Sequence, residues 1–295
     1  RAMTEYLTTR ELAELLRIKE RKVYDLAASG KVPCSRATGR LLFPRAELEA
    51  WIERQRTGTP QNAAAASRPN VILGSHDPLL EWALRESRSG LATYFDGSTD
   101  GLRRFEAREG LAAGLHLYDA DVDDWNTPAI LGACSRLPAV LIEWARRRRG
   151  LIVRPGLEGD IRAIADLSGH TFAARQKEAG AQRLFDHLAA KANLEPASLD
   201  ATVTARSETD AALAILDGTA DATFGLQSLA EQYRLGFVPL VEERFDMLVD
   251  RHSWFEPPMQ SLIAFSRTEV FRQHAAAFPG YDVSGLGTVH FNAAA

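Results

Sequence analysis

The first fifty residues carry cationic side chains at a spacing that could read DNA. Lys19, Arg21, Lys22 and Tyr24 lie at or near the start of a predicted helix over residues 19–29, which Gly30 would end. Side chains at the start of such a helix can reach base edges in a major groove. A plain solvated surface is the alternative reading of the same residues.

Three further polar residues follow on a predicted hairpin. Arg36, Thr38 and Arg40 flank a turn near Thr38–Gly39, where they would meet phosphates or a minor groove. Residues 1–57 hold 12 Lys and Arg against 8 Asp and Glu, whereas the remaining residues hold 23 against 31. A basic arm on an acidic body is expected when only one end of a protein meets a polyanion.

The elements that position these cations form a recognisable order. Thr8 and Thr9 precede a short helix over residues 10–16, the helix over 19–29 follows, and another helix opens at Pro44 after the hairpin. Two short helices joined by a few residues are typical of a helix-turn-helix. The stretches YLTTRELAELL, KVYDLAASGKVP and GRLLFPRAELEAWI resemble the excisionase-like, MerR-related winged helix-turn-helix family. The resemblance implies double-stranded DNA as a partner.

From Asn70 onward, short apolar strands alternate with helices. This repetition predicts an α/β fold with a doubly wound, parallel architecture. The expected strands cover residues 71–73, 92–95, 113–117, 151–153, 171–174, 222–224 and 237–241.

Small hydroxyl residues and one arginine follow several of these strands. Ser75 and Ser98 come after two strands of the first half, and Arg175 follows a strand of the second half. Helix starts offer unpaired N–H donors and a partial positive charge, which suit an anion. Ligands of open α/β sheets bind beyond the carboxyl ends of the strands, so these loops could converge on one crevice. A serine at such a position can also be only a helix cap.

The same loops resemble a known family, the periplasmic-binding-protein-like (type II) domain found fused to DNA-binding modules and to molybdenum-cofactor biosynthesis enzymes. The resemblance implies two lobes, a hinge and a ligand in the cleft between them. After Arg-Gln, where the family usually carries glycines and serines, this chain has KEAGA over residues 177–181, which would weaken a backbone cradle for the ligand. The matching stretches are residues 74–77, 97–102, 116–119, 125–128, 175–176 with 182–183, 242–246 and 279–282.

The domain organisation follows from these two resemblances. We expect a winged helix-turn-helix domain at 3–56, a linker at 57–69 and a two-lobed domain at 70–295. The linker is rich in Ala, Gly, Thr and Ser and shows no hydrophobic periodicity. Lobe one would comprise 70–152 and 246–295, and lobe two 153–245, with hinge crossings near 152–155 and 242–248.

The resemblance suggests molybdate or tungstate as the ligand, although several candidate side chains are larger than a bare tetrahedral anion requires. Aromatic and planar groups beside one arginine would also suit an organic anion or a pterin-type molybdenum cofactor. His116, Tyr118 and Trp125 could alternatively serve only the packing of the lobe. The predicted ligand-binding residues are Ser75, His76, Ser98, Thr99, His116, Tyr118, Trp125, Asn126, Arg175 and Gln176.

Catalytic and metal patterns are sparse in this sequence. We find no GxSxG, HExxH, P-loop or dinucleotide-binding glycine pattern, so we expect no enzyme and no cofactor. The pairs His76–Asp77 and His116–Asp119 lack third-ligand spacing, so we expect no metal site. The run Arg146–Arg149 is predicted to end a helix that begins near Leu137, where cations suit the helix dipole.

These observations together predict a ligand-responsive transcriptional regulator. Two cysteines in different units, no signal peptide and no apolar run of membrane-spanning length favour the cytoplasm, with no membrane partner and with Met3 as the natural start. A single small DNA-binding module buries little surface, so a homo-oligomer, most simply a dimer, is expected. An enzyme acting on a small anion and a recombination accessory factor are the alternatives.

Overall fold

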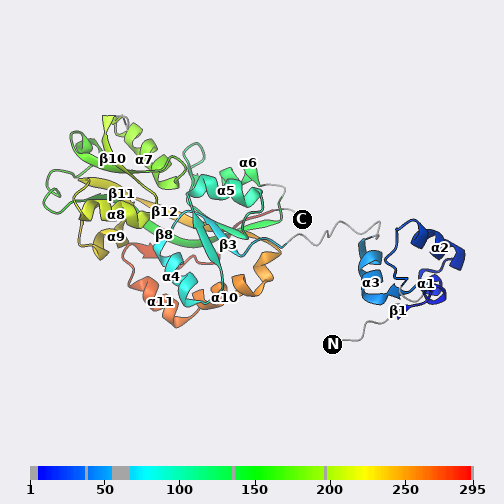
Figure 1. Cartoon of the computed structure of the whole chain (residues 1–295). Helices are drawn as coiled ribbons and strands as arrows, with labels where there is room; N and C mark the ends of the chain where they lie inside the picture. The colour runs from blue at the N-terminus through cyan, green and yellow to red at the C-terminus, as the bar shows by residue number, and fades with distance from the viewer. Residues whose placement is uncertain (1–5, 37–38, 55–66, 135–136, 196–197, 294–295) are drawn as a thin grey trace. The chain divides into compact units, whose positions relative to one another are not determined.

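The computed structural model describes residues 6–36, 39–54, 67–134, 137–195 and 198–293, and it divides the chain into two compact units (Figure 1). The first unit is Arg1–Ala65 and the second is Ala66–Ala295. The boundary between them falls inside the expected linker, most of which lies outside the described residues.

The first unit contains the expected pair of helices. Its elements are β1 (Tyr6–Leu7), α1 (Thr9–Leu16), α2 (Glu20–Ala28), β2 (Phe43–Pro44) and α3 (Arg45–Arg54). The α1 helix begins at a capping box, because Thr8 Oγ1 accepts from Glu11 N while Glu11 Oε2 accepts from Thr8 N. Leu12, Val23, Phe43 and Leu48 are fully buried and form the centre of this small core.

Two details of this unit concern the predicted hairpin and the third helix. An antiparallel bridge joins Ser35 to Leu42, as a hairpin requires, while Ala37 and Thr38 at its expected turn lie outside the described residues. Pro44 was expected to open the third helix, but it pairs with Tyr6 in β2, and α3 begins one residue later.

The second unit is built on one mixed ten-stranded sheet. Eight of its strands follow the order β10-β9-β11-β8-β12-β5-β3-β4, and two short strands, described below, pair with β8 off this path. The strands β10, β9 and β11 are parallel to one another, and so are β5, β3 and β4. Between these two groups lie β8 and β12, which are antiparallel to each other and to the strands beside them. The strands are β3 (Val71–Gly74), β4 (Ala92–Phe95), β5 (Ala112–Leu115), β8 (Ala139–Val153), β9 (Thr171–Arg175), β10 (Asp200–Ala205), β11 (Ala222–Leu226) and β12 (Gly236–Asp250).

Short strands and helices complete this unit. The hairpin β6 (Tyr118–Asp119) and β7 (Asp124–Trp125) stands apart from the main sheet, whereas β13 (Tyr281–Asp282) and β14 (Val289–Asn292) pair with β8. The helices are α4 (Pro78–Glu86), α5 (Ser98–Glu106), α6 (Thr127–Ala133), α7 (Gly180–Lys191), α8 (Glu208–Leu216), α9 (Gln227–Gln232), α10 (Pro257–Ser266) and α11 (Glu269–Ala276), with 3₁₀ turns η1 (Ile164–Leu167) and η3 (Ser253–Phe255).

Helices lie against both faces of this sheet, and each side has its own apolar cores (Figure 1). Ile72, Trp144 and Phe245 belong to one side, and Phe172 and Phe185 to the other. This is a two-lobed α/β fold, as the sequence predicted. The long strands β8 and β12 that run between the lobes were not predicted, and their antiparallel pairing makes the sheet mixed and not wholly parallel. None of the helices in the described ranges is long and apolar enough to cross a membrane.

The prediction for Arg146–Arg149 was wrong. These residues do not end a helix; they lie in the middle of β8, a strand of 15 residues. Successive side chains of a strand point to opposite faces, and here Arg147 and Arg149 are fully buried while Arg146 and Arg148 are exposed. A long apolar stretch before the arginines is compatible with either element, so local pattern did not distinguish them.

Candidate functional site

Two buried serines and a histidine meet where three strands of lobe one end. Ser75 follows β3, Ser98 begins α5 after β4, and His116 follows β5; each is at most 1% exposed. Ser75 Oγ lies 2.7 Å from Ser98 Oγ, and the backbone N–H of His116 donates to Ser98 Oγ at 3.1 Å. The structure therefore brings together three of the predicted ligand-binding residues in one hydroxyl-rich cluster.

The start of α7, from the other lobe, lies directly against this cluster. A Cβ added to Gly180 would come within 2.5 Å of His116 O and 3.1 Å of Ser98 Oγ. A Cβ on Gly97, whose φ is +99°, would come within 2.8 Å of Glu178 O. The residues that depart from the family pattern, 177–181, thus provide a close backbone approach between the lobes.

Polar contacts span the same junction. The backbone N–H of Thr99 donates to Glu178 O at 3.1 Å, and Gln176 Nε2 donates to Asp96 Oδ1 at 3.1 Å. Gln176 Oε1 is buried and has no partner among the described residues. The N-termini of α5 and α7 consequently converge on one place, and both carry the partial positive charge of a helix start.

A chain of buried ion pairs lies beneath this junction. Arg147 Nη1 donates to Asp77 Oδ2 at 2.7 Å, and Arg147 Nη2 donates to Glu243 Oε1. Arg149 Nη2 donates both to the same Glu243 oxygen and to Glu208 Oε1, each at 2.8 Å. The two arginines lie on β8 and Glu243 on β12, so the long strands place the pairs between the lobes.

Two residues extend the chain into the lobes. In lobe one, the hydroxyl of Tyr281 donates to Asp77 Oδ2 at 2.5 Å. In lobe two, Arg175 Nη1 lies 3.0 Å from Glu208 Oε1, at the start of α8. We call the set Asp77, Arg147, Arg149, Arg175, Glu208, Glu243 and Tyr281 the buried ionic network.

The charges of the buried ionic network balance. Burial alone would raise the pKa of Glu208 and Glu243, but the neighbouring arginines lower it to about 2 for Glu208 and well below the ordinary value for Glu243. Three guanidinium groups therefore face three carboxylates. Little positive charge is left over to bind an anion, and any anion at the junction would depend on hydroxyl and backbone donors.

His116 links the hydroxyl cluster to the buried ionic network. Its Nδ1 lies 3.0 Å from Glu243 Oε2, and its ring stacks on Phe245. Burial lowers the pKa of His116 even though Glu243 opposes this shift. A neutral ring that donates from Nδ1 to Glu243 is the state that these contacts favour.

Other predicted ligand residues make contacts within lobe one. Asn126, with φ of 61°, accepts from Leu117 N at 2.6 Å and donates to Asp246 Oδ2 at 2.8 Å. His76 Nε2 lies 3.0 Å from Glu81 Oε2, while its buried Nδ1 has no described partner. These side chains hold loops beside the cluster in place.

Tyr118 and Trp125 form the hairpin β6–β7, which reaches from lobe one onto α7 of lobe two. The Tyr118 ring lies 5.1 Å from Trp125 and 5.8 Å from His187, measured between centroids. The Tyr118 hydroxyl donates to Asp123 at 2.7 Å. A cavity of about 140 Å³ lies here, lined by these residues together with Leu184, Leu188, Lys191, Val241 and Glu242.

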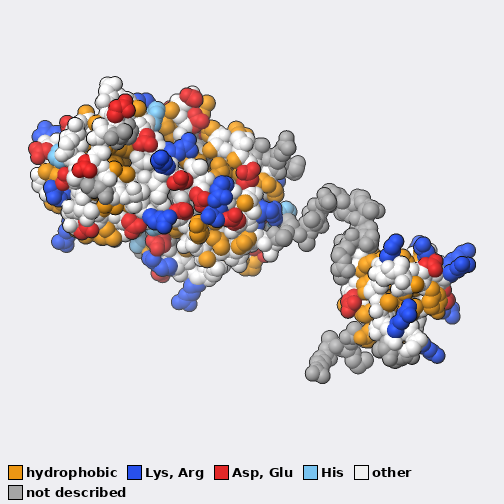
Figure 2. Space-filling view, turned by 45° about the horizontal axis from the view of Figure 1, so that its top comes forward, with side chains coloured by type: hydrophobic (Ala, Val, Ile, Leu, Met, Phe, Trp, Pro, Cys, Tyr) orange, Lys and Arg blue, Asp and Glu red, His pale blue; other side chains and the backbone are white. Residues whose placement is uncertain are grey.

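The predicted DNA-binding side chains are exposed in the first unit. Lys19, Arg21, Lys22 and Tyr24 lie at the start of α2, and none of the three cations makes a hydrogen bond or ion pair with another described residue. Arg36 and Arg40 are exposed on the hairpin, and Thr38 lies outside the described residues. Figure 2 shows cationic side chains projecting from this unit.

A concave surface of this unit is lined by Tyr24 of the first group and by Arg36 and Arg40 of the second. It encloses about 650 Å³ and combines α1 and α2 with the hairpin. Its lining includes Thr8, Arg10, Glu20, Tyr24, Arg36 and Arg40. Donors and cations along one groove can contact phosphate oxygens, which are the commonest protein–DNA hydrogen-bond acceptors.

Sequence reasoning missed most of the buried ionic network. Asp77, Arg147, Arg149, Glu208, Glu243 and Tyr281 were not predicted as site residues, although Arg175 was. Two signals were available: the family-matching stretches 74–77, 242–246 and 279–282 contain Asp77, Glu243 and Tyr281, and a strand through 146–149 would bury two of its four arginines. No group of three His, Cys, Asp or Glu side chains suited to a metal ion occurs among the described residues.

Comparison with known proteins agrees with this architecture. A family model for the PBP superfamily domain matches residues 81–267, and one for a helix-turn-helix domain matches residues 6–56. The chain belongs to the PBP superfamily, whose members share the periplasmic-binding-protein fold, and it joins that domain to an excisionase-like helix-turn-helix.

One relative is similar along nearly the whole chain. The uncharacterized protein YvgK of Bacillus subtilis (strain 168) is 25% identical over 305 residues, covering 97% of this chain and 98% of that protein. The similarity therefore extends over both units of this chain.

Among solved structures, a substrate-binding protein of Clostridium perfringens with bound phosphate superposes with a TM-score of 0.51. It is 12% identical and covers 70% of this chain and 96% of its own. PhnD1 of Prochlorococcus marinus (MIT 9301), in complex with methylphosphonate, gives a TM-score of 0.48 at 11% identity, covering 74% and 92%. At such identities the likeness concerns the fold.

Proposed function

We propose that this protein is a ligand-responsive DNA-binding regulator that takes up a small oxyanion between the lobes of its second unit. The observation that carries the proposal is the convergence of the Ser75–Ser98 hydroxyl pair with the N-termini of α5 and α7 at the lobe junction. Hydroxyls and backbone N–H groups are neutral donors, which suit a compact, multiply charged oxyanion.

The state of the nearby cations supports an oxyanion over an organic or pterin-type anion. Arg175, the cation expected for the organic ligand, is engaged with Glu208. Tyr118 and Trp125 pack against α7 at His187 instead of joining the serine pair. Molybdate and tungstate follow from the sequence resemblance, and phosphate follows from the C. perfringens neighbour.

Ligand binding would act on DNA through the equilibrium between lobe arrangements. A ligand that contacts both α5 and α7 stabilises the arrangement in which these helix starts are close. That shift would change how the DNA-binding units of a dimer are presented to the operator. In this scheme the second unit binds without catalysing a reaction, and the protein acts in the cytoplasm as a homo-oligomer.

The first test is thermal unfolding of the full chain with phosphate, sulfate, molybdate and tungstate. A specific ligand raises the unfolding midpoint by several degrees because it binds only the folded state. DNA selected by the protein from a random pool then provides an operator, on which affinity is measured with and without that ligand. Unchanged midpoints with every anion, or unchanged operator affinity at saturation, would refute the proposal.

A glycine pair provides the matched control. Gly180→Ala places a methyl group within 2.5 Å of His116 O, so it should diminish the ligand-induced rise of the midpoint. Gly159→Ala adds a methyl group with no heavy atom within 4 Å and should leave the rise unchanged. Equal responses of the two variants would place the ligand elsewhere.

A further inference from the structure

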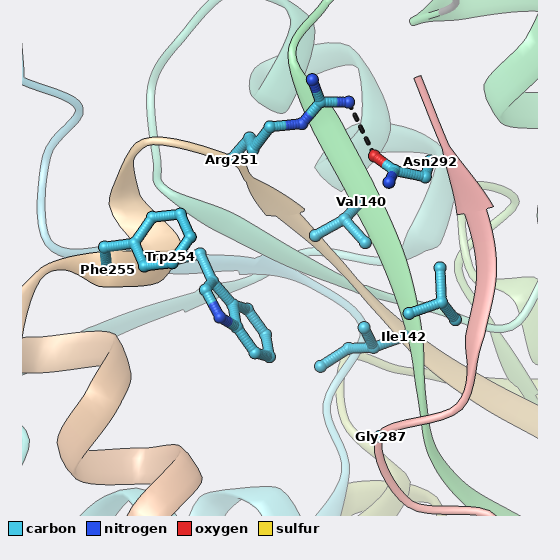
Figure 3. A pocket seen from close by; sticks show the side chains of 8 residues that line it. Val140, Ile142, Arg251, Trp254, Phe255, Gly287 and Asn292 are labelled. Atoms are coloured by element: carbon cyan, nitrogen blue, oxygen red, sulfur yellow. Dashed lines mark hydrogen bonds between the residues drawn. The ribbon is translucent and has the colours of Figure 1, made fainter. Parts of the chain in front are cut away.

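A second concave surface lies away from the lobe junction, on the far part of lobe one. It encloses about 350 Å³ between β8, β14 and the segment that follows β12 (Figure 3). Val140 and Ile142 on β8 are roughly 16 Å or more along the strand from Arg147, at about 3.3 Å per residue. The lining of the cavity includes no residue of the buried ionic network and neither serine of the Ser75–Ser98 pair.

Most of this cavity is apolar. Val140, Ile142 and Val289 come from the paired strands, and Trp254 and Phe255 from η3. Phe255 is 74% exposed and Val289 is 56% exposed, although both line a concave surface. Apolar side chains left open to solvent around a cavity are typical of a place where another apolar group binds.

One end of the cavity is polar and cationic. Arg251 Nη2 donates to Asn292 Oδ1 at 2.6 Å (Figure 3). The same nitrogen also donates to Ala293 O. No carboxylate among the described residues forms an ion pair with Arg251, and its Nε and Nη1 have no described acceptor. Toward the described part of the chain, the guanidinium thus has donors left over at the edge of an apolar cavity.

We propose that this cavity binds a small carboxylate with an aromatic or branched apolar body. The apolar body would lie between Trp254 and the valine and isoleucine side chains of β8 and β14. The carboxylate would accept from Nε and Nη1 of Arg251, which have no acceptor among the described residues, in a geometry that planar guanidinium groups favour. A volume of about 350 Å³ is at the lower end of small-molecule sites, and the few polar groups would fix the ligand's orientation.

The test compares phenylacetate with its neutral isostere phenylacetamide on the full chain, using ligand-observed NMR titration. We expect saturable binding of both, with the acid tighter by about tenfold, which corresponds to 1.4 kcal/mol. Arg251→Gln should remove the advantage of the acid and leave amide binding unchanged, so the amide reports whether the cavity is intact. Equal binding of the two compounds to the wild-type protein would overturn the proposal.

A variant that fills the cavity tests whether phenylacetate and phenylacetamide bind there. Val289→Trp should abolish binding of both compounds, because the new ring occupies the cavity and Val289 is exposed enough to accept it. Val270→Trp, on α11 at 60% exposure and outside the cavity, is the matched control and should bind as the wild type does. Binding retained in Val289→Trp would contradict the assignment.

A second copy of the chain is the rival occupant. In that case the protein would sediment as a dimer that Val289→Trp dissociates, and phenylacetate would show no saturable binding up to millimolar concentration. Either result would overturn the carboxylate site. Neither bears on the oxyanion proposal, whose readout is the unfolding midpoint with inorganic anions and the Gly180→Ala variant.

Discussion

Arginine and lysine serve opposite purposes in the two units. In the first unit, Lys19, Arg21 and Lys22 are exposed and have no described partner. In the second unit, Arg147 and Arg149 are fully buried, and carboxylates neutralise both. A cation is available to a polyanion only in the first case. The difference teaches that a run of basic residues indicates a binding surface only once its partners inside the protein are known.

The largest effect should come from breaking the charge balance of the buried network. Glu243→Gln removes the one carboxylate shared by Arg147 and Arg149, and we expect it to destabilise the second unit by about 3–5 kcal/mol. Urea unfolding followed by tryptophan fluorescence measures this, because four of the five tryptophans belong to that unit.

The neighbouring glutamate provides the control. Glu242 precedes Glu243, and its side chain is 60% exposed, so Glu242→Gln should change the free energy of unfolding by about 0.5 kcal/mol or less. A similar loss of unfolding free energy in both variants would mean that the buried, paired Glu243 stabilises the fold no more than an exposed glutamate does.

Acid should weaken the buried ionic network of the second unit. The pKa of Glu208 is lowered to about 2 from an ordinary value of 4.5, so this carboxylate stabilises the fold above pH 4.5. That stability is lost as the pH falls from 4.5 towards 2. The free energy of unfolding of Glu208→Gln should therefore fall less steeply over this range. An equally steep fall would exclude Glu208 as a cause.

Removing exposed cations should weaken DNA binding while leaving the fold intact. For Arg21→Ala combined with Lys22→Ala, we expect operator affinity to fall by about tenfold or more and the salt dependence to become shallower. The unfolding midpoint should stay unchanged because neither side chain has a described partner. Fluorescence anisotropy on labelled operator DNA at several salt concentrations measures both quantities.

An exposed cation of the second unit tests whether position matters. The side chain of Arg272 is 60% exposed and forms an ion pair with Glu269. Arg272→Ala should leave operator affinity unchanged. A loss equal to that of the double variant would show that DNA contacts are not confined to the first unit.

The smallest effect should come from the hydroxyl at the edge of the network. Tyr281→Phe removes the donor to Asp77, and burial together with Asp77 already raises the pKa of Tyr281 well above its ordinary value, so the proton is firmly held. We expect a loss of about 1–2 kcal/mol in the free energy of unfolding. Tyr233→Phe is the control, since the Tyr233 hydroxyl has no described partner, and a comparable loss there would remove the case for the Tyr281 bond.

The sequence by itself determined many of the short elements and their order, although not the long strand β8. Signals that act within a few residues can be recognised in the sequence. They are the capping residues Thr8 and Glu11, the terminating Gly30 and the alternation of apolar strands with helices. They predicted the helix pair of the first unit and strands such as 92–95, as well as the loops that carry Ser75 and Ser98.

Only the tertiary structure decided which charges meet. Arg147 pairs with residues 70 and 96 positions away, and Gly180 meets His116 across the junction of two lobes. Such partners depend on how β8 and β12 align after folding, and the local periodicity of the sequence does not predict that register. Whether a buried cation finds a carboxylate or is left for a ligand is therefore set by the sheet's register and by the packing of the lobes.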